Sequence, residues 1–164
     1  MDEFYYVPPL RNVEDATLAR LYREARSSNN VYLGLLFYWH SLVYPSTDDR
    51  AAVDYINRLW KRPPRERSCI SDSIERILQK PLFSPTHATP VSLGDYLREG
   101  IRNSIAHIVR NRPNSRSLQL DLLSELRHLN DAKDVLHYCS RHRLKNERGM
   151  NEPHDLEIFR YFSP

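Results

Sequence analysis

The chain has 164 residues, which is the size of one domain, and 40% of them are hydrophobic, so it can bury one sizeable core. Its 24 lysines and arginines against 21 aspartates and glutamates leave a formal charge of +3. This small positive charge permits binding to a polyanion. It is well below that of proteins that coat nucleic acid, so this class of protein is excluded. We therefore expect a single domain over residues 1–164.

Glycine is scarce and proline is common, with 4 glycines against 11 prolines, which favours helices ended by prolines and predicts an all-α fold. Cys69 and Cys139 form no CxxC pair, so neither a zinc knuckle nor a disulfide framework is expected, and a reducing cytoplasm fits. The start, MDEFYYVPPL, lacks the regions of a signal peptide, and the apolar run at 31–39 is too short to cross a bilayer. We expect a soluble, cytoplasmic protein with no membrane partner.

Helical spacing of apolar residues predicts four helices in the first half of the chain. The first, at 13–29, has acidic residues early and basic residues late, as the helix dipole favours. The second, NNVYLGLLFYWHSLVYP at 29–45, is apolar on almost every face, which indicates a helix that is buried on most sides or shared with a partner subunit. A third helix is predicted at 46–61 and a short fourth one at 71–80.

Three further segments carry predictions of their own. The loop KRPPRER, at 61–67, is interpreted as solvated, or alternatively as contacting phosphate together with Arg58. The segment at 117–145 reads as one long helix or two helices broken near Asn130, forming core or a dimer surface. The apolar tail, HDLEIFRYFSP, is expected to dock on the bundle or on the other subunit.

The helix predicted at 92–110 has two distinct sides. Its apolar residues recur at three- and four-residue steps and comprise Leu93, Leu97, Ile101, Ile105 and Ile108. At about 100° per residue, the opposite, polar side holds Asp95, Tyr96, Arg102, Asn103, His107 and Arg110.

Three residues of this polar side suit the metal-free cleavage of RNA. Arg102 offers a forked cation for a phosphodiester, Asn103 a neutral hydrogen-bond donor, and His107 a group for proton transfer near neutral pH. The ribose 2'-hydroxyl would lose its proton and attack phosphorus, while arginine meets the developing charge. The same spacing also fits a polar helix face without any catalytic role.

The segment RNSIAH, at 102–107, resembles the Arg-Asn-x-x-x-His motif of the HEPN superfamily, the higher-eukaryote and prokaryote nucleotide-binding domains. GDYLREGIRNSIAHIVR, at 94–110, is similar to the motif helix of the bacterial MauJ-like and Apea-type HEPN branch. LGLLFYWHSLVYP, at 33–45, resembles the aromatic-rich early helix of that branch. The resemblance is close over 94–110 and looser over most of the chain.

The resemblance implies a helical bundle that dimerises through its motif helices around one composite, metal-independent ribonuclease cleft without a cofactor. Arg102 would stabilise the phosphorane, Asn103 would orient the phosphate, and His107 would transfer a proton. The residues expected to bind the substrate around them are Arg98, Arg110 and Tyr96. The substrate would be single-stranded or loop RNA, such as tRNA, cut to 2',3'-cyclic phosphate and 5'-hydroxyl ends. Family members act as toxins or antiphage effectors, which implies an antitoxin or sensor protein as a further partner.

The chain departs from the family pattern at two places. Val109 stands where one toxin branch has the tyrosine that receives an inactivating modification. The stretch HSLVYP, at 40–45, lacks the glutamate that the MauJ-like branch often carries there. Because some HEPN domains are non-catalytic, an RNA- or protein-binding interaction module is the competing hypothesis. Helix-turn-helix DNA binding stays open for any small basic helical protein, although no suitable helix pair is evident.

The remaining histidines are interpreted as structural or solvated. His40 is expected to be a hydrogen-bonded core histidine, or alternatively to lie at the edge of the composite cleft. No metal site is expected from the sequence HYCSRH, because its spacing does not put three ligands on one helix face. His128 and His142 are expected to be solvated. A basic end that contacts RNA would comprise Arg141, His142, Arg143, Lys145 and Arg148.

Overall fold

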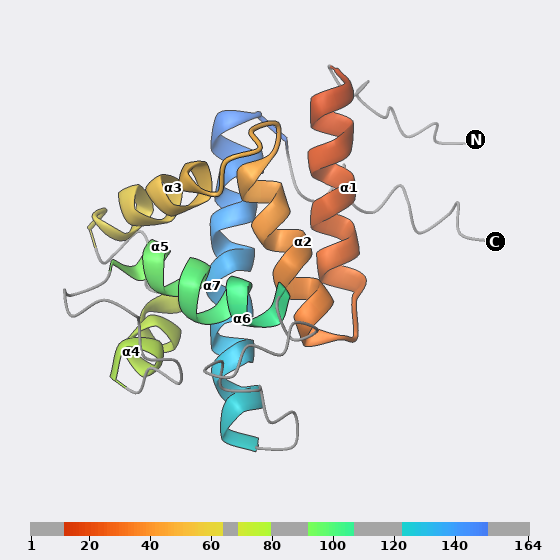
Figure 1. The fold of residues 1–164 in the computed structure, drawn as a ribbon. Coiled ribbons are helices and arrows are strands. Elements are labelled where there is room, and N and C mark those ends of the chain that lie inside the picture. Colours follow the sequence, from red (N-terminus) through yellow and green to blue (C-terminus); the bar gives the residue numbers. More distant parts are fainter. Residues whose placement is uncertain (1–11, 64–68, 80–91, 107–122, 151–164) are drawn as a thin grey trace, which may run out of the picture.

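The computed structural model describes residues 12–63, 69–79, 92–106 and 123–150, and these ranges contain helices and no strand (Figure 1). The all-α prediction is confirmed. The helical elements are α1 (Val13–Ser27), α2 (Val31–Val43), α3 (Arg50–Trp60), α4 (Ser71–Gln79), α5 (Leu93–Tyr96), the π-helix η2 (Leu97–Arg102), α6 (Asn103–Ala106) and α7 (Leu123–Glu147).

Side-chain caps explain where the first helices begin. Asn12 Oδ1 accepts the N–H of Asp15 at 2.8 Å, and Asn30 Oδ1 accepts the N–H of Tyr32 at 2.9 Å, so α1 and α2 each follow an asparagine cap. The third helix begins at Arg50, after the Ser, Thr and Asp capping candidates that open the predicted segment 46–61, and Asp48 accepts the Arg50 N–H through its side chain. The predicted apolar stripes therefore hold, while the start of α3 depends on this local capping.

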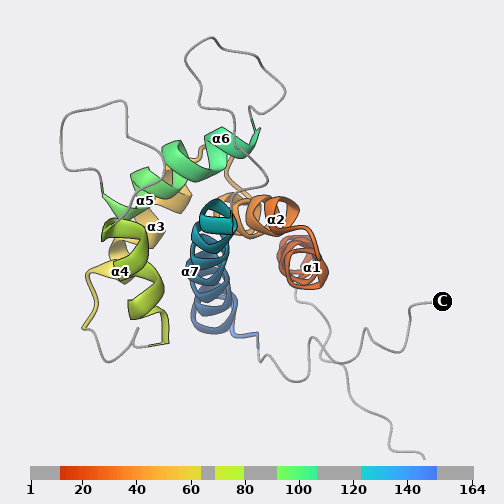
Figure 2. The same ribbon diagram turned by 90° about the horizontal axis from the view of Figure 1, so that it is seen from below.

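Helix α7 forms the centre of the bundle. Figures 1 and 2 show α1 and α2 along one side of α7, α3 and α4 along the other, and the α5–α6 segment crossing from the α3 side towards α2. Leu129, Val135 and Leu136 of α7 are fully buried in the shared core. The helix runs through Asn130 without a break, so of the two alternatives for this segment the single long helix is correct.

The motif helix sits directly on the backbone of α3. A Cβ atom at Gly94 would lie 2.6 Å from the carbonyl oxygen of Val53, so only glycine permits this approach. The Gly94 N–H donates to Asn57 Oδ1 at 2.9 Å, and Asn57 Nδ2 donates to Ser92 Oγ at 2.9 Å. These contacts fix the start of the motif helix against the middle of α3.

Three histidines of α7 are each hydrogen-bonded to a tyrosine hydroxyl from a different helix. The pairs are His128 with Tyr96 of α5 at 2.8 Å, His137 with Tyr22 of α1 at 2.7 Å, and His142 with Tyr55 of α3 at 2.8 Å. The prediction of solvated histidines is wrong for His128, which is buried, and His142 is half-buried. A tyrosine hydroxyl supplies the partner that lets an imidazole leave water.

Acid should destabilise the fold through His128. Burial lowers the pKa of His128, and the nearby carboxylate of Asp131 opposes this shift more weakly. The stabilising effect of the neutral imidazole is therefore fully present above the unfolded pKa, about 6.5, and is lost as the pH falls through the lower folded pKa. We expect the unfolding free energy of His128→Gln to fall less than that of the wild type between neutral pH and pH 5, measured by urea denaturation.

The matched control for this measurement is His40→Gln. It removes an exposed histidine of α2 and leaves the Tyr96–His128 pair intact. If His128→Gln and the wild type lost stability equally on acidification, the buried histidine would not be the source of the acid sensitivity.

Candidate functional site

The motif helix contains a π-helical segment, η2, that ends at Arg102, the first residue of the motif. The N–H of Asn103 donates to the carbonyl of Arg98, five residues earlier, which is the π-helical pattern. Leu93, Leu97 and Ile101 are buried, so the predicted apolar side is confirmed for them. Such π-turns inside α-helices are frequent at functional sites.

The predicted position of Tyr96 on the polar side is wrong. Tyr96 is 4% exposed, and its hydroxyl is bonded to His128 Nε2 inside the bundle. The sequence-based rotation assumed a uniform 100° per residue, whereas the wider turn of η2 rotates less per residue between Tyr96 and Arg102. Tyr96 therefore supports the motif helix from within the core, and direct contact with a substrate is not open to it in this arrangement.

Arg102 is held from two sides. Its Nη1 donates to Asn103 Oδ1 at 2.8 Å, and its Nη2 lies 3.3 Å from Asp49 Oδ2. The side chain is 25% exposed, so the guanidinium lies at the surface but is restrained. Its Nε is buried and has no hydrogen-bond partner in the described part of the chain. Because Asn103 accepts through Oδ1, its amide nitrogen points elsewhere and remains a donor.

Asp49 is a site residue that sequence reasoning missed. It precedes α3 at the N-cap position, yet its side chain makes no cap bond there. Its Oδ1 instead accepts the indole N–H of Trp39 at 2.9 Å, while Oδ2 faces Arg102. The available signal was a pair of aspartates, Asp48 and Asp49, where one suffices to cap the helix. A carboxylate thus reaches the motif arginine although α2 carries no glutamate near its end.

Arg98 is paired with carboxylates of its own helix. Its Nη2 lies 2.8 Å from Glu99 Oε1 and 3.9 Å from Asp95 Oδ1. The hydrogen bond with Glu99, and the charges of Glu99 and Asp95, raise the pKa of Arg98. Arg50 of α3 also approaches Asp95 Oδ1, at 3.6 Å. Carboxylates therefore already pair with the positive charge of Arg98. The sequence-based expectation was that Arg98 would be available to bind a phosphate.

The structure thus brings together Arg102 and Asn103 and adds Asp49. Arg98 lies close enough to Asp49 for that charge to act on it, but its ion pairs are with Glu99 and Asp95, and Tyr96 is turned into the core. His107 and Arg110, the other two predicted site residues, lie outside the residues that the structure describes. The expected roles of His107 in proton transfer and of Arg110 in substrate binding remain predictions.

His40 lies on the outer side of α2, and the interpretation as a core histidine is wrong. It is exposed, and its neighbours along this side of α2 are Leu33, Leu36 and Phe37. The helix is apolar all round, so the type of residue beside His40 did not distinguish its inner from its outer side. A place for His40 at the edge of a composite cleft remains a prediction.

The predicted basic end of α7 is largely occupied by internal contacts. Arg143 Nη1 donates to the Ser41 carbonyl at 2.6 Å, which ties α7 to α2. Arg148 lies 3.3 Å from Glu14 and 3.4 Å from Asp15 of α1. Both arginines therefore join helices of the bundle, and among the predicted basic residues Arg141 and Lys145 are exposed.

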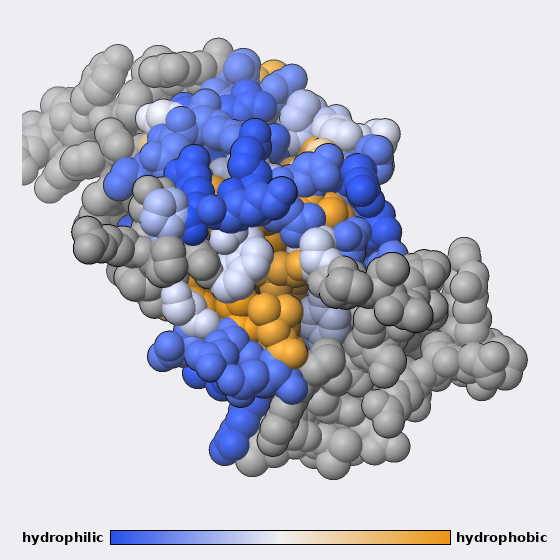
Figure 3. Space-filling view, turned by 90° about the vertical axis from the view of Figure 1, so that its left-hand side faces the viewer, coloured by the Kyte–Doolittle hydropathy of each residue, from blue (hydrophilic) through white to orange (hydrophobic). Residues whose placement is uncertain are grey.

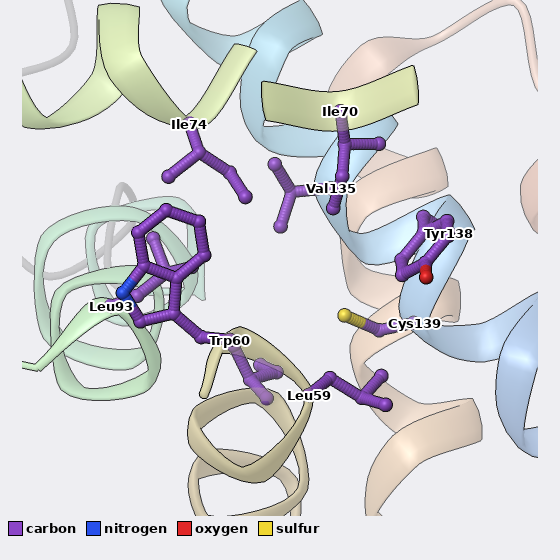
Figure 4. A pocket seen from close by; sticks show the side chains of 9 residues that line it. Leu59, Trp60, Ile70, Ile74, Leu93, Val135, Tyr138 and Cys139 are labelled. Atoms are coloured by element: carbon purple, nitrogen blue, oxygen red, sulfur yellow. The ribbon is translucent and has the colours of Figure 1, made fainter. Parts of the chain in front are cut away.

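A small apolar pocket opens between α3, α4 and α7 (Figure 4). Figure 3 shows hydrophobic surface in this area, between hydrophilic parts of the molecule. Leu59, Ile74, Leu93 and Cys139 contribute to its lining, and its volume of about 10 Å³ is roughly the space of one water molecule. Burial raises the pKa of the Cys139 thiol to about 12, which keeps it protonated. The pocket is too small and too apolar to hold a nucleotide.

The ranges that the structure describes lack a cluster of metal ligands and a membrane-spanning helix. No three histidine, cysteine, aspartate or glutamate side chains there are grouped as metal ligands, and Cys69 and Cys139 are both free thiols. None of the helices in the described ranges combines the length and the apolar character needed to cross a membrane.

Residues 18–145, which run from α1 through the motif helix to α7, match the family described as "Methylamine utilization protein MauJ". No curated protein and no solved structure matches the chain.

Proposed function

We propose that the chain, which belongs to the MauJ family, is a metal-independent endoribonuclease that cuts single-stranded or loop RNA, such as tRNA. MauJ-like proteins lie in the HEPN-related group, which supports the reading of RNSIAH as an HEPN motif. Two copies would place their motif helices at one cleft in the cytoplasm, and the enzyme would act as a toxin or antiphage effector under the control of an antitoxin or sensor protein.

The observation that supports this function best is the setting of Arg102. A guanidinium that is oriented by Asn103 and Asp49, yet remains 25% exposed, is preorganised to meet negative charge arriving from solvent. Surface ion pairs contribute little to stability, so the main effect of this double restraint is to orient the guanidinium.

The proposed reaction moves two protons, one from the attacking 2'-oxygen and one to the leaving 5'-oxygen. A base takes the proton of the ribose 2'-hydroxyl, the 2'-oxygen attacks the neighbouring phosphorus, and the bond from phosphorus to the 5'-oxygen breaks. The 5'-oxygen leaves with a proton, which gives 2',3'-cyclic phosphate and 5'-hydroxyl ends. Arg102 would stabilise the phosphorane, the Asn103 amide would donate to a phosphate oxygen, and His107 would carry one of the two protons.

The function is tested by incubating the purified protein in EDTA with a single-stranded RNA and with the all-deoxy strand of the same sequence. We expect cleavage of the RNA alone, with cyclic phosphate at the new ends, and none by Arg102→Ala. Arg76→Ala is the matched control, because it removes an arginine that pairs with Asp131 on another part of the bundle. Cleavage of the DNA strand, or equal cleavage by wild type and Arg102→Ala, would contradict the proposal.

A second candidate function is supported by the same contacts. Asn103 and Asp49 already engage both terminal nitrogens of Arg102, as expected if the motif were a structural element of a non-catalytic binding module. A module of this kind would bind RNA in a gel-shift assay without cutting it, and its affinity would be insensitive to His107→Ala.

A further inference from the structure

We propose, resting on the ribonuclease function proposed above, that Asp49 is the positioning residue that sets the orientation of Arg102 toward the phosphate. Asp49 does not touch the substrate in this assignment. It acts through the guanidinium, 3.3 Å from its Oδ2.

The Asp49 carboxylate contacts Arg102 and does not cap the first turn of α3. An aspartate at the N-cap normally accepts an N–H from the first turn of its helix. Asp49 makes no such bond, and the neighbouring Asp48 accepts the Arg50 N–H at 2.9 Å in its place. The side chain of Asp49 is thus available to bridge two other residues, Trp39 and Arg102.

Trp39 anchors this bridge in the core. Its ring is fully buried in α2, and its indole N–H donates to Asp49 Oδ1 at 2.9 Å. Close packing holds the buried Trp39 ring in one position. The hydrogen bond from this ring therefore fixes the Asp49 carboxylate, although it lies between two helices. The position of Arg102 is consequently fixed by the core of the bundle, through Asp49 and Trp39, and not by a loop.

The geometry of the guanidinium explains why the fixed position of Arg102 is important. Each terminal nitrogen of arginine carries two N–H groups. Asn103 engages Nη1 and Asp49 engages Nη2, so one N–H on each nitrogen remains to donate to a phosphate. Two parallel N–H donors form the fork that suits two phosphate oxygens. Without Asp49, the Arg102 side chain would keep its charge but lose one of the two contacts that direct this fork.

Two substitutions of Asp49 separate the effect of losing the carboxylate from the effect of losing side-chain volume. Asp49→Ala removes both acceptor oxygens. Asp49→Asn keeps the size but replaces one of the two carboxylate oxygens, which face Trp39 and Arg102 separately, by an NH₂ group that cannot accept. The matched control is Asp48→Ala, which removes the adjacent aspartate that caps α3 and leaves the bridge intact.

The first measurement follows cleavage kinetics. We expect kcat of Asp49→Ala to fall about 10²-fold, as for a misplaced catalytic group, with a smaller change in KM. Asp49→Asn should also lose activity, and Asp48→Ala should stay close to wild type. Wild-type kcat in Asp49→Ala would overturn the assignment.

The second measurement does not depend on catalysis. The indole N–H of Trp39 and the Nε–H of Arg102 are followed by NMR, with an uncleavable 2'-O-methyl oligonucleotide as the probe. We expect Asp49→Ala to shift the Trp39 signal and to increase the motion of the Arg102 side chain, and Asp48→Ala to do neither. If the wild type cuts no RNA but these NMR changes appear, the ribonuclease function fails while the positioning of Arg102 by Asp49 stands. Unchanged Arg102 motion in Asp49→Ala would overturn the positioning role.

Discussion

Arg102→Lys is expected to reduce RNA cleavage by about 10²- to 10³-fold, nearly as far as Arg102→Ala. The substitution keeps the positive charge but replaces the planar fork by a single ammonium group. An ammonium cannot donate to Asn103 and Asp49 and still present two parallel N–H groups to a phosphate. The measurement is kcat/KM on a defined single-stranded RNA in EDTA, with thermal unfolding to establish that the variant is folded.

Retention of most of the activity by Arg102→Lys would show that charge alone is required at this position. In that case the contacts from Asn103 and Asp49 would have no catalytic meaning. The control is Arg76→Lys, which makes the same substitution in an arginine that pairs with Asp131 in the contact between α4 and α7.

Leu136→Ala is expected to lower the free energy of unfolding by about 2–5 kcal/mol. Leu136 is 1% exposed in the middle of α7, where the helices on both sides of the bundle meet, so its loss leaves a cavity that the surrounding helices cannot fill. Urea denaturation followed by circular dichroism measures the change.

Leu33→Ala is the matched control, since Leu33 is 48% exposed on the outer side of α2. Its expected effect is within about 0.5 kcal/mol, as for most surface substitutions. A similar loss in the two variants would mean that the face of α2 containing Leu33 is covered by another chain or segment in solution, contrary to its exposure in the structure.

The helices of the first half of the chain were predictable because their stabilising contacts follow a period in the sequence. Leu18 and Tyr22 of α1 and Ile56 of α3 lie on apolar stripes and are buried as the stripes predict. Proline and capping residues mark their ends. Periodicity is therefore sufficient where a helix is regular and one face is apolar.

The candidate site was only partly predictable because its geometry depends on deviations from regularity and on contacts distant in the sequence. Tyr96 was misplaced because the π-turn changes the rotation per residue. His128 was taken as solvated because its partner, Tyr96, comes from another helix. Asp49 was missed because its contact with Arg102 depends on how α3 packs against the motif helix.

The way in which α3 holds the motif helix couples their motions. The two are joined near the start of α3 by Arg50 to Asp95 and by Asp49 to Arg102, and in its middle by the Asn57 amide and the close approach of Gly94. Attachment at separate points along an axis resists rotation as well as translation. A partner that displaced α3 would therefore move Arg102 as well. Binding at the exposed side of α3 would in this way change the position of the motif arginine.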